Sequence, residues 1–554
     1  MVASAATAAL ALTVVHAAAI PARSLAATPG APPAWALTWA VLGIAAAFAL
    51  VHLAAWQRRR LAWLGGAIAA VAAVTLAVLH PGGPAVAAVT GAIGFLQTQA
   101  SLRLSRRLSP SLAGLFRRRP VVTVLWGVLA VLMLVQVGRL STYMADPSTD
   151  WWLTTRQEWW AKHMCMPAYI EAADLNRQGA ANVYADEHYL ALRRAAKPRL
   201  TVVNMEAFVG DPFQYPPPFL LLPRLALMLT NDYLTLRTFW FAIQLVGFAC
   251  VAFWLAAWVN GSAGRTAAFL FPAVLLSVPV LQSLQYGQFH LAALVLALGG
   301  MLAVAKGRDA LGGTLIAAAT LAKIFPGLLL VVLVVQRRWR AIGWTITSAA
   351  GISLVALLVI GPQPFRAFGE YQLPRVATGA AFDFAGEYPE LRETVIADNL
   401  SPAALVSRLH EFGAAWATPR LGTAVMSLYA LFVLAAAVLA GRRSNSRREA
   451  ACAWLALLNL AALQSPGAFA DYVGAGSVWL LVWYPDVFRG SLRGAAWLLA
   501  GWIFFALSPG IPPVPASMPV PVTMALTGIG GMLLIGFNAW ALVRRVPAPA
   551  VQRS

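Results

Sequence analysis

Apolar segments close to the length of a membrane-spanning helix recur along most of the sequence, and this repetition constrains the fold more than any other feature. A helix needs about 20 predominantly apolar residues to cross the hydrocarbon core of a bilayer. The composition agrees, because 60% of the 554 residues are hydrophobic, 11% are charged and the mean hydropathy is +0.70. The chain is therefore predicted to be an all-α polytopic membrane protein and not a soluble domain with one anchor.

Two long hydrophilic stretches divide the apolar segments into three groups. The expected spans are 2–20, 35–56, 61–79, 85–102 and 121–140, then 235–258, 266–284, 287–305, 310–321, 323–336 and 341–361, then 421–441, 449–465, 467–485, 494–508 and 519–543. The first span lacks the basic residues that open a signal peptide. Residues 216–230 and 310–336 contain proline and do not fit single spans, so they predict half-helices or a re-entrant element.

The net charge of +20 is concentrated in short connections between the spans. The arginine clusters are 58–60, 103–107, 117–119, 337–340, 442–448 and 544–545. Such clusters at span ends are typical of cytoplasmic loops. The charge is thus explained by topology, and no nucleic-acid partner is expected. We expect a multi-pass protein of the cell inner (plasma) membrane, with both termini inside.

The carboxylates have the opposite distribution. Sixteen of the 21 aspartates and glutamates lie in the two hydrophilic stretches, nine in residues 141–215 and seven in residues 362–420. Both stretches are therefore placed outside the membrane as long extracytoplasmic loops. The first is too long for a mere connector, and its tryptophans indicate helices at the membrane interface.

Four short motifs lie near the expected outer surface. They are YIEAADLNRQGAANVY (169–184), YPPPFLLLPR (215–224), LQYGQFH (284–290) and GRDALGGTLIAAATLAKIFPG (307–327). The first predicts a small amphipathic helix ended by Gly179. The prolines of the second fix an extended entry of the chain into the bilayer. The three cysteines show no metal-ligand spacing and no disulfide framework.

Three side chains in these motifs are candidates for binding. Lys323 is a cation in an otherwise apolar stretch, which is costly unless it faces a cavity or a partner. An anionic lipid phosphate would be a natural partner, and a lysine that snorkels at a span end is the alternative. Gln288 could hydrogen-bond a sugar hydroxyl or the backbone of a helix. His290 is more often a satisfied interface histidine than a catalyst.

Together the motifs resemble glycosyltransferase family 87, the polyprenyl-phosphate-mannose-dependent mannosyltransferases with the GT-C fold. The resemblance is carried by Tyr169, Ala172, Gly179 and Tyr184, by Tyr215-Pro216-Pro217, by Gly287-Gln288, by Lys323 and Pro326 with the following RRWR, and by Ser465-Pro466 ahead of Asp471-Tyr472. It covers residues 121–490, the expected transferase core. Residues 1–120 would be extra spans of unknown role, and residues 491–554 C-terminal spans with a short cytoplasmic tail.

The resemblance implies a GT-C-like multi-span helical bundle that transfers mannose or a related sugar. The donor would be a polyprenyl-phosphate sugar and the acceptor a hydroxyl of a lipid or glycan at the outer face, with inversion. The donor phosphate would lie near Lys323, and Tyr215, Gln288 and His290 would complete the donor site. A carboxylate base would take the acceptor proton. No cofactor and no metal ligands are assigned, although scattered loop carboxylates could hold a divalent cation.

One position departs from the family pattern. The family carries an aspartate as its base about four residues before the first tyrosine of the motif, and Cys165 stands there in this chain. A thiol is mostly protonated at neutral pH and is a poor base. The candidates for the catalytic base are therefore Asp150, then Glu171, then Glu158.

Two other classes of function are kept as alternatives. A transporter or flippase of lipid-linked sugars would show polar residues near the bilayer midplane and two related halves, and the sequence shows few such residues and no inverted repeat. A catalytically inactive family member would keep the fold without the base, and Cys165 supports that alternative.

Overall fold

The computed structural model describes residues 163–193, 200–382, 392–443, 446–484 and 519–544, most of 139–148, and single positions at 133, 136, 137, 501 and 505. The predicted spans before residue 121 lie outside the described residues, as does almost all of 121–140 and 494–508. The division of the chain at residues 120 and 490 stays a prediction.

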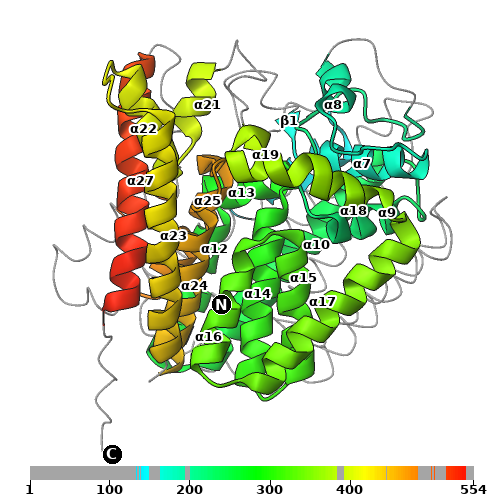
Figure 1. Cartoon of the computed structure of the whole chain (residues 1–554). Coiled ribbons are helices and arrows are strands. Elements are labelled where there is room, and N and C mark those ends of the chain that lie inside the picture. The colour runs from blue at the N-terminus through cyan, green and yellow to red at the C-terminus, as the bar shows by residue number, and fades with distance from the viewer. Residues whose placement is uncertain are drawn as a thin grey trace, which may run out of the picture.

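The described part is built almost entirely from helices, which confirms the prediction of an all-α polytopic membrane protein (Figure 1). Among the described residues, four helices are long and apolar enough to cross a membrane: α10 (Tyr233–Val259), α17 (Trp339–Ile360), α23 (Pro419–Arg442) and α27 (Val520–Val543). The two strands of this part form a short parallel pair, β1 (His163–Met164) with β2 (Val209–Gly210), and two isolated β-bridges join Val203 to Asp232 and Asn399 to Phe469.

A fifth candidate span is sharply bent. It joins α13 (Val278–Gln285) to α14 (Phe289–Ala305) at an angle of 108°. The chain reaches α13 through α11 (Gly261–Phe269) and α12 (Phe271–Leu275), and prolines open α12 and α13. A proline breaks a helix because it lacks the backbone N–H and clashes with the preceding turn. The sequence expected separate spans at 266–284 and 287–305, and the structure has several shorter helices in the first.

Residues 309–335 form a helical hairpin, as the prediction of half-helices required. The first arm is α15 (Asp309–Ala322); the second is η2 (Phe325–Leu328) followed by α16 (Leu329–Val335). Both arms are too short to be counted among the candidate spans. In Figure 1 the loops from α14 to α15 and from α16 to α17 lie at the same end of the bundle. Lys323 therefore lies at the tip of a re-entrant hairpin.

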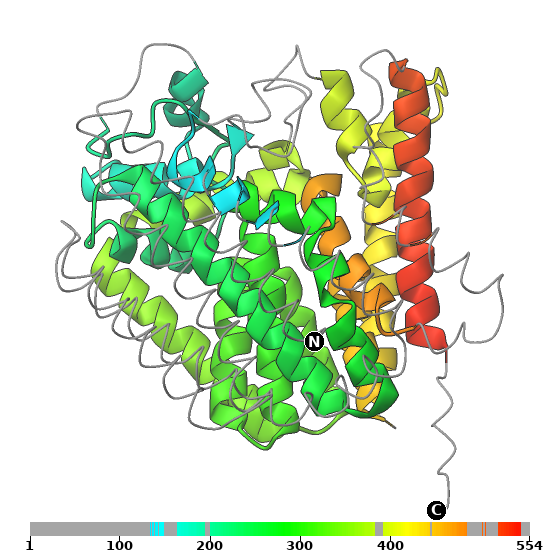
Figure 2. The same ribbon diagram turned by 180° about the vertical axis from the view of Figure 1, so that it is seen from behind.

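The long helices run between an upper and a lower end of the molecule, and Figure 2 shows the same arrangement from behind. The upper end of Figure 1 carries α7 (Met166–Arg177), α8 (Asp186–Arg193), α18 (Gln363–Ala367), α19 (Leu373–Thr378), α21 (Arg392–Asp398) and α22 (Pro402–Glu411). The π turn η3 (Phe368–Gln372) and the 3-10 turn η4 (Ala380–Phe382) flank α19. The described parts of the two expected outer loops thus lie together.

An ion pair joins these two loops. The Arg375 guanidinium on α19 donates to both carboxylate oxygens of Asp186 on α8, at 3.0 and 2.5 Å, and also donates to the Tyr371 hydroxyl. Both charged side chains are about one-quarter exposed. A bidentate pair of this kind fixes orientation as well as distance, so the first and second loops are held in one arrangement.

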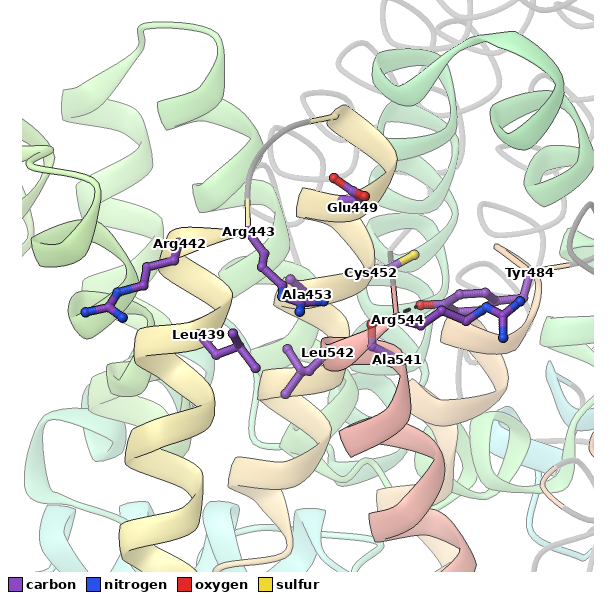
Figure 3. A pocket seen from close by; sticks show the side chains of 10 residues that line it. All are labelled: Leu439, Arg442, Arg443, Glu449, Cys452, Ala453, Tyr484, Ala541, Leu542 and Arg544. Carbon is purple, nitrogen blue, oxygen red and sulfur yellow. Dashed lines mark hydrogen bonds between the residues drawn. The ribbon is translucent and has the colours of Figure 1, made fainter. Parts of the chain in front are cut away.

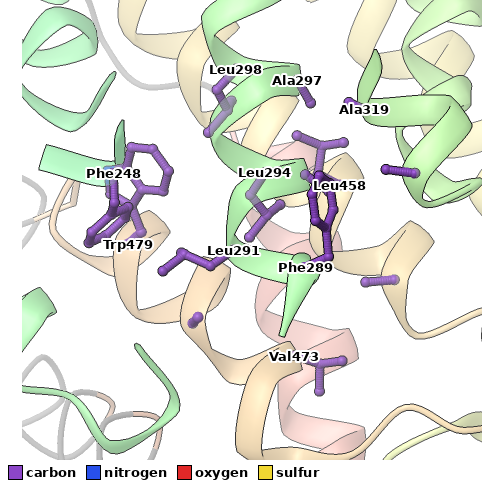
Figure 4. Packing of buried hydrophobic residues seen from close by; sticks show 14 of the residues in the cluster. Phe248, Phe289, Leu291, Leu294, Ala297, Leu298, Ala319, Leu458, Val473 and Trp479 are labelled. Atoms are coloured by element: carbon purple, nitrogen blue, oxygen red, sulfur yellow. The ribbon is translucent and has the colours of Figure 1, made fainter. Parts of the chain in front are cut away.

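The core is centred on α14 (Figure 4). Leu291, Leu294 and Leu298 lie between Phe248 of α10 and the helices on the other side of α14. Phe248 meets Trp479 of α25 (Ala470–Leu481) edge to face, with ring centres 5.0 Å apart. Such aromatic contacts add stabilisation beyond the buried area.

Small residues let α15 approach α14 closely. A Cβ atom at Gly300 would lie 2.7 Å from Ile316 Cγ1, and one at Gly312 would lie 2.5 Å from Val304 Cγ2. Helices in membranes pack through such small residues because lipid supplies no hydrophobic drive between them. This contact fixes the first arm of the hairpin, and hence the position of its tip.

Polar side chains also join the helices of the C-terminal half. Asn459 of α24 (Arg447–Ala462) donates to Asn538 of α27, and Asn538 donates to Ser477 of α25, at 2.8 and 2.9 Å. A Cβ atom at Gly476 would lie 1.8 Å from Asn459 Oδ1, so a larger residue there would displace the Asn459 amide. Interhelical hydrogen bonds are a common means of association inside a membrane.

Candidate functional site

Two tyrosines and a glutamine from three separate motifs form one hydrogen-bonded group at the upper end of the bundle. Gln288 Oε1 accepts from the Tyr215 hydroxyl at 2.8 Å and from the Tyr169 hydroxyl at 3.2 Å. The two hydroxyl oxygens are 2.6 Å apart. We call Tyr169, Tyr215 and Gln288 the tyrosine–glutamine cluster.

Gln288 is placed by the bend between α13 and α14. Gly287 has φ +63°, and a Cβ atom there would lie 2.9 Å from Met166 Cβ and 3.3 Å from Trp240 Cδ1. Trp240 Nε1 donates to the Gly287 carbonyl at 2.9 Å. A glycine is needed because this backbone conformation strains other residues. The Gly-Gln pair of the motif is thus a tight turn that points the amide at the two tyrosines.

Tyr169 comes from the first turn of α7, which is preceded by Cys165. The sequence predicted a helix ended by Gly179, and α7 does end just before Gly179, where φ is +80°. The prediction of an amphipathic helix was wrong, because ten of its twelve residues are buried. Among the described elements, β2, η1 (Pro217–Leu220) and α9 (Leu221–Ala226) pack against α7.

The proline run positions Tyr215. Pro216 has φ −56° and ψ 149°, and the 3-10 helix η1 (Pro217–Leu220) starts immediately after it, followed by α9 (Leu221–Ala226). The Tyr215 carbonyl accepts a hydrogen bond from the Tyr184 hydroxyl at 3.0 Å. The Phe219 ring stacks on Tyr215 with centres 4.6 Å apart. Because the proline ring restricts φ to values near that of Pro216, the run limits the backbone conformations next to Tyr215.

Lys323 at the hairpin tip reaches the same cluster. It ends α15 with extended backbone, its side chain is half-buried, and its ammonium nitrogen lies 5.3 Å from the centre of the Tyr215 ring. That distance is within the range of a cation–π contact. His290 is buried and stacks on Phe325, two positions after Lys323, with ring centres 5.0 Å apart. The four residues that the sequence predicts to bind the donor therefore lie close together: Lys323, Tyr215, Gln288 and His290.

Cys165 belongs to this site as well. Gln288 Nε2 donates to Cys165 Sγ at 3.3 Å, and the Cys165 N–H donates to the Tyr286 carbonyl at 2.9 Å. The residue that replaces the family's aspartate thus touches the cluster directly. The donor site predicted from the sequence does not include Tyr169, although Tyr169 begins one of the motifs, and Cys165 enters that prediction only as a departure from the family pattern.

The chemistry of the assembled groups favours binding of hydroxyls and an anion. Burial, together with the nearby Tyr215, raises the pKa of Tyr169 well above its ordinary value. Tyr169 therefore stays a neutral phenol that can donate and accept hydrogen bonds. Lys323 adds a positive charge, but the tyrosine–glutamine cluster with Cys165, Lys323 and His290 contains no carboxylate.

Glu171 lies in α7 but on a different face from Tyr169. Two residues along a helix correspond to a rotation of about 200°. Glu171 is fully buried, and neither carboxylate oxygen has a hydrogen-bond partner among the described residues. Burial, with a smaller effect of Asp174, raises its pKa to about 9. Glu171 is therefore mostly protonated at neutral pH. Asp150 and Glu158 lie outside the described residues.

Asp174 and the Ser465-Pro466 motif have structural partners. Asp174 accepts from the Thr201 N–H at 2.8 Å and from Arg177 at 2.7 Å. Burial alone would raise the pKa of Asp174, but the hydrogen bonds from Thr201 and Arg177 outweigh it and the pKa is lowered. The Pro466 carbonyl accepts from Asn399 Nδ2 at 2.6 Å. That motif therefore anchors the second outer loop to the end of α24.

A metal site is not evident in the described part of the chain, where no group of three or more histidine, cysteine, aspartate or glutamate side chains could hold an ion.

The described helices, with a re-entrant hairpin and a bent span whose tips meet at one polar cluster, define an all-α polytopic membrane protein with a site at one end. Residues 213–466 match the model of glycosyltransferase family 87. The match confirms the resemblance drawn from the motifs and implies a membrane glycosyltransferase. It includes Tyr215, Gln288 and Lys323, whereas Cys165 and Tyr169 precede it. No curated protein and no solved structure matches the chain.

Proposed function

We propose that the chain transfers mannose from a polyprenyl-phosphate donor to a hydroxyl of a lipid or glycan acceptor at the outer face of the inner membrane. One observation carries the proposal: the re-entrant hairpin brings Lys323 to the ring of Tyr215, which is itself bound to Gln288. The family match at residues 213–466 supports transfer of a sugar. The GT-C fold of the family is part of the same proposal.

The roles follow from the chemistry of each group. Lys323 binds the donor phosphate and stabilises the negative charge that develops as the phosphate leaves. The Tyr215 hydroxyl, the Gln288 amide and His290 offer hydrogen bonds to the sugar. Attack by the acceptor oxygen forms the new bond to the anomeric carbon while the bond to the phosphate oxygen breaks, and this single displacement inverts the configuration. The proton of the acceptor hydroxyl passes to a carboxylate.

Asp150 remains the first candidate for that carboxylate. Glu171 is the second, but its burial and raised pKa weigh against it, because a base must be ionised to take a proton. Glu158 is the third. Asp150 and Glu158 both lie in the first outer stretch, whose described part contributes Tyr169 and Cys165 to the site.

The experiment is a transfer assay in membranes that contain matched amounts of each variant, with labelled polyprenyl-phosphate mannose as the donor. Asp150→Asn should lower transfer by about 10²-fold, the scale of a lost general base. Asp146→Asn is the matched control, because Asp146 lies in the same segment and binds the Ser148 hydroxyl at 2.6 Å. Full activity in Asp150→Asn would remove that residue from the mechanism, and Glu171→Gln and Glu158→Gln would then be compared.

A catalytically inactive relative is the second candidate, because a thiol occupies a position that touches the cluster. The same assay separates the two proposals with the variant Cys165→Asp. If the natural chain shows no transfer with the mannose donor and Cys165→Asp gains it, the inactive alternative is supported. If the natural chain is active, that alternative is excluded.

A further inference from the structure

A basic cavity lies at the lower end of the bundle, opposite the tyrosine–glutamine cluster. It has a volume of about 260 Å³ and lies between α23, α24 and α27 (Figure 3). Arg442, Arg443 and Arg544 contribute to its wall, and Glu449 is the one acidic lining residue. The wall thus has an excess of two positive charges.

The arginines reach the cavity from different helices. Arg443 extends from the end of α23 and donates to the Val543 carbonyl at the end of α27. The Arg544 guanidinium lies over the Trp540 ring, 5.1 Å from its centre. Figure 3 shows Arg544 beside Tyr484, whose hydroxyl donates to the Ala541 carbonyl at 3.3 Å. Arg443 and Arg544 therefore lie beside one space, where the mutual repulsion of their charges favours an anion. Arg442 is exposed, and its side chain points away from the other lining residues in Figure 3.

The remaining wall is apolar. Leu439 and Leu542 line it together with Ala453. About 15 Å³ is enough for one water, so a cavity of about 260 Å³ can accept a much larger group. A guanidinium offers a rigid fork of donors that matches the oxygens of a phosphate. Basic pockets between membrane helices on the cytoplasmic side are suited to the headgroups of anionic lipids.

We propose that this cavity binds a phosphate group, supplied by the headgroup of an anionic phospholipid or by a free phosphate ion. The site is separate from the proposed transfer reaction, because the cluster lies at the other end of the helices (Figure 1). The competing explanation is that these arginines only mark the cytoplasmic side. In that case they should behave like the arginines of the 337–340 cluster, which do not line the cavity.

The test compares two charge-matched double variants of the full chain. Arg442→Gln with Arg544→Gln alters the cavity but leaves Arg443 on the Val543 carbonyl. Arg338→Gln with Arg340→Gln removes two exposed arginines at the same end, away from the cavity. Native mass spectrometry measures bound phosphatidylglycerol against phosphatidylcholine. A thermal-shift measurement in phosphatidylcholine nanodiscs with added inorganic phosphate forms the second arm.

We expect phosphatidylglycerol to bind the natural chain and the Arg338/Arg340 variant alike, and the Arg442/Arg544 variant about tenfold more weakly, the scale of a lost charge-assisted contact. Stabilisation by inorganic phosphate alone, lost in the same variant, would identify a free ion as the source. Equal losses in both variants, or no preference for either phosphate probe over phosphatidylcholine and buffer, would overturn the proposal. Unchanged phosphate binding in the Arg442/Arg544 variant would also overturn it.

Discussion

The ammonium nitrogen of Lys323 lies 5.3 Å from the centre of the Tyr215 ring, although the two residues come from separate motifs. Lys323 stands at the tip of the re-entrant hairpin, and Tyr215 is held by the proline run and by Gln288. The contact keeps a cation beside hydroxyl groups at one end of the bundle. The Lys323–Tyr215 contact joins the hairpin tip to the proline run and, through Tyr215, to Gln288, and the first three predictions concern these three parts.

Replacement of Lys323 should weaken binding of the lipid donor. Lys323→Ala is expected to raise the KM for polyprenyl-phosphate mannose about tenfold, because one charge-assisted contact to the phosphate is lost. Lys323→Arg should partly restore it, since a guanidinium also binds phosphate. Lys306→Ala is the control, because Lys306 is an exposed lysine that follows α14 at the lower end. An unchanged KM in Lys323→Ala would show that Lys323 only snorkels.

Replacement of Pro216 and Pro217 by alanine should lower turnover more than the amount of protein in the membrane. The prolines fix the backbone next to Tyr215, and a small displacement of a binding group can cost up to about 10²-fold in rate. The matched control is Pro402→Ala with Pro419→Ala, which removes two prolines from the starts of α22 and α23. Normal turnover in the Pro216/Pro217 variant would show that the prolines only start the following helix and do not position the site.

Removal of the Gln288 amide should separate the cluster and expose Cys165. Gln288→Leu keeps a similar size but loses the bonds to Tyr215, Tyr169 and Cys165. We expect lower transfer and faster maleimide labelling of Cys165 in a background where Cys250 and Cys452 are serine. The control is Gln282→Leu, since Gln282 is also buried but its amide has no hydrogen-bond partner among the described residues. Equal labelling in both variants would contradict the role of Gln288.

Glu171 should make the stability of the outer part depend on pH. Its pKa is raised to about 9 in the folded protein from an ordinary value of 4.5. The folded state therefore binds the proton of Glu171 more tightly than the unfolded state does. The resulting contribution to the free energy of unfolding is fully present below pH 4.5 and is lost as the pH rises toward 9. We expect the Tm to fall between pH 6 and 9 in the natural chain and to fall much less in Glu171→Gln.

The control for this measurement is Glu187→Gln, because Glu187 is exposed at the start of α8 and should leave the pH profile unchanged. Glu171→Gln should also be more stable than the natural chain at pH 8, since a neutral amide does not have to be discharged on burial. Identical profiles for Glu171→Gln and the natural chain would show that the carboxyl is hydrated or ionised in the folded state.

The sequence by itself determined the class of the protein, and four of the expected spans coincide with the long apolar helices α10, α17, α23 and α27 of the described residues. Runs of apolar residues long enough for a bilayer require helices, because only helices and closed barrels satisfy backbone hydrogen bonds in lipid. The prolines near residues 216 and 326 also predicted breaks in the helices, where the structure has the short elements η1 and η2, since a proline interrupts a preceding helix. The residues of the site could be chosen because a lysine, a glutamine and a histidine are unusual in apolar surroundings.

Only the tertiary structure decided which of these residues meet and which carboxylates do not. Tyr169, Tyr215 and Gln288 are distant in the sequence, and Gln288 reaches the two tyrosines through the bend of 108° between α13 and α14. The close packing of α15 against α14 places Lys323 beside them. The sequence did not show that Glu171 is buried away from Tyr169, because the face a helical residue presents depends on what encloses the helix. Local pattern determines elements, whereas long-range packing determines the surroundings, and therefore the pKa, of each side chain.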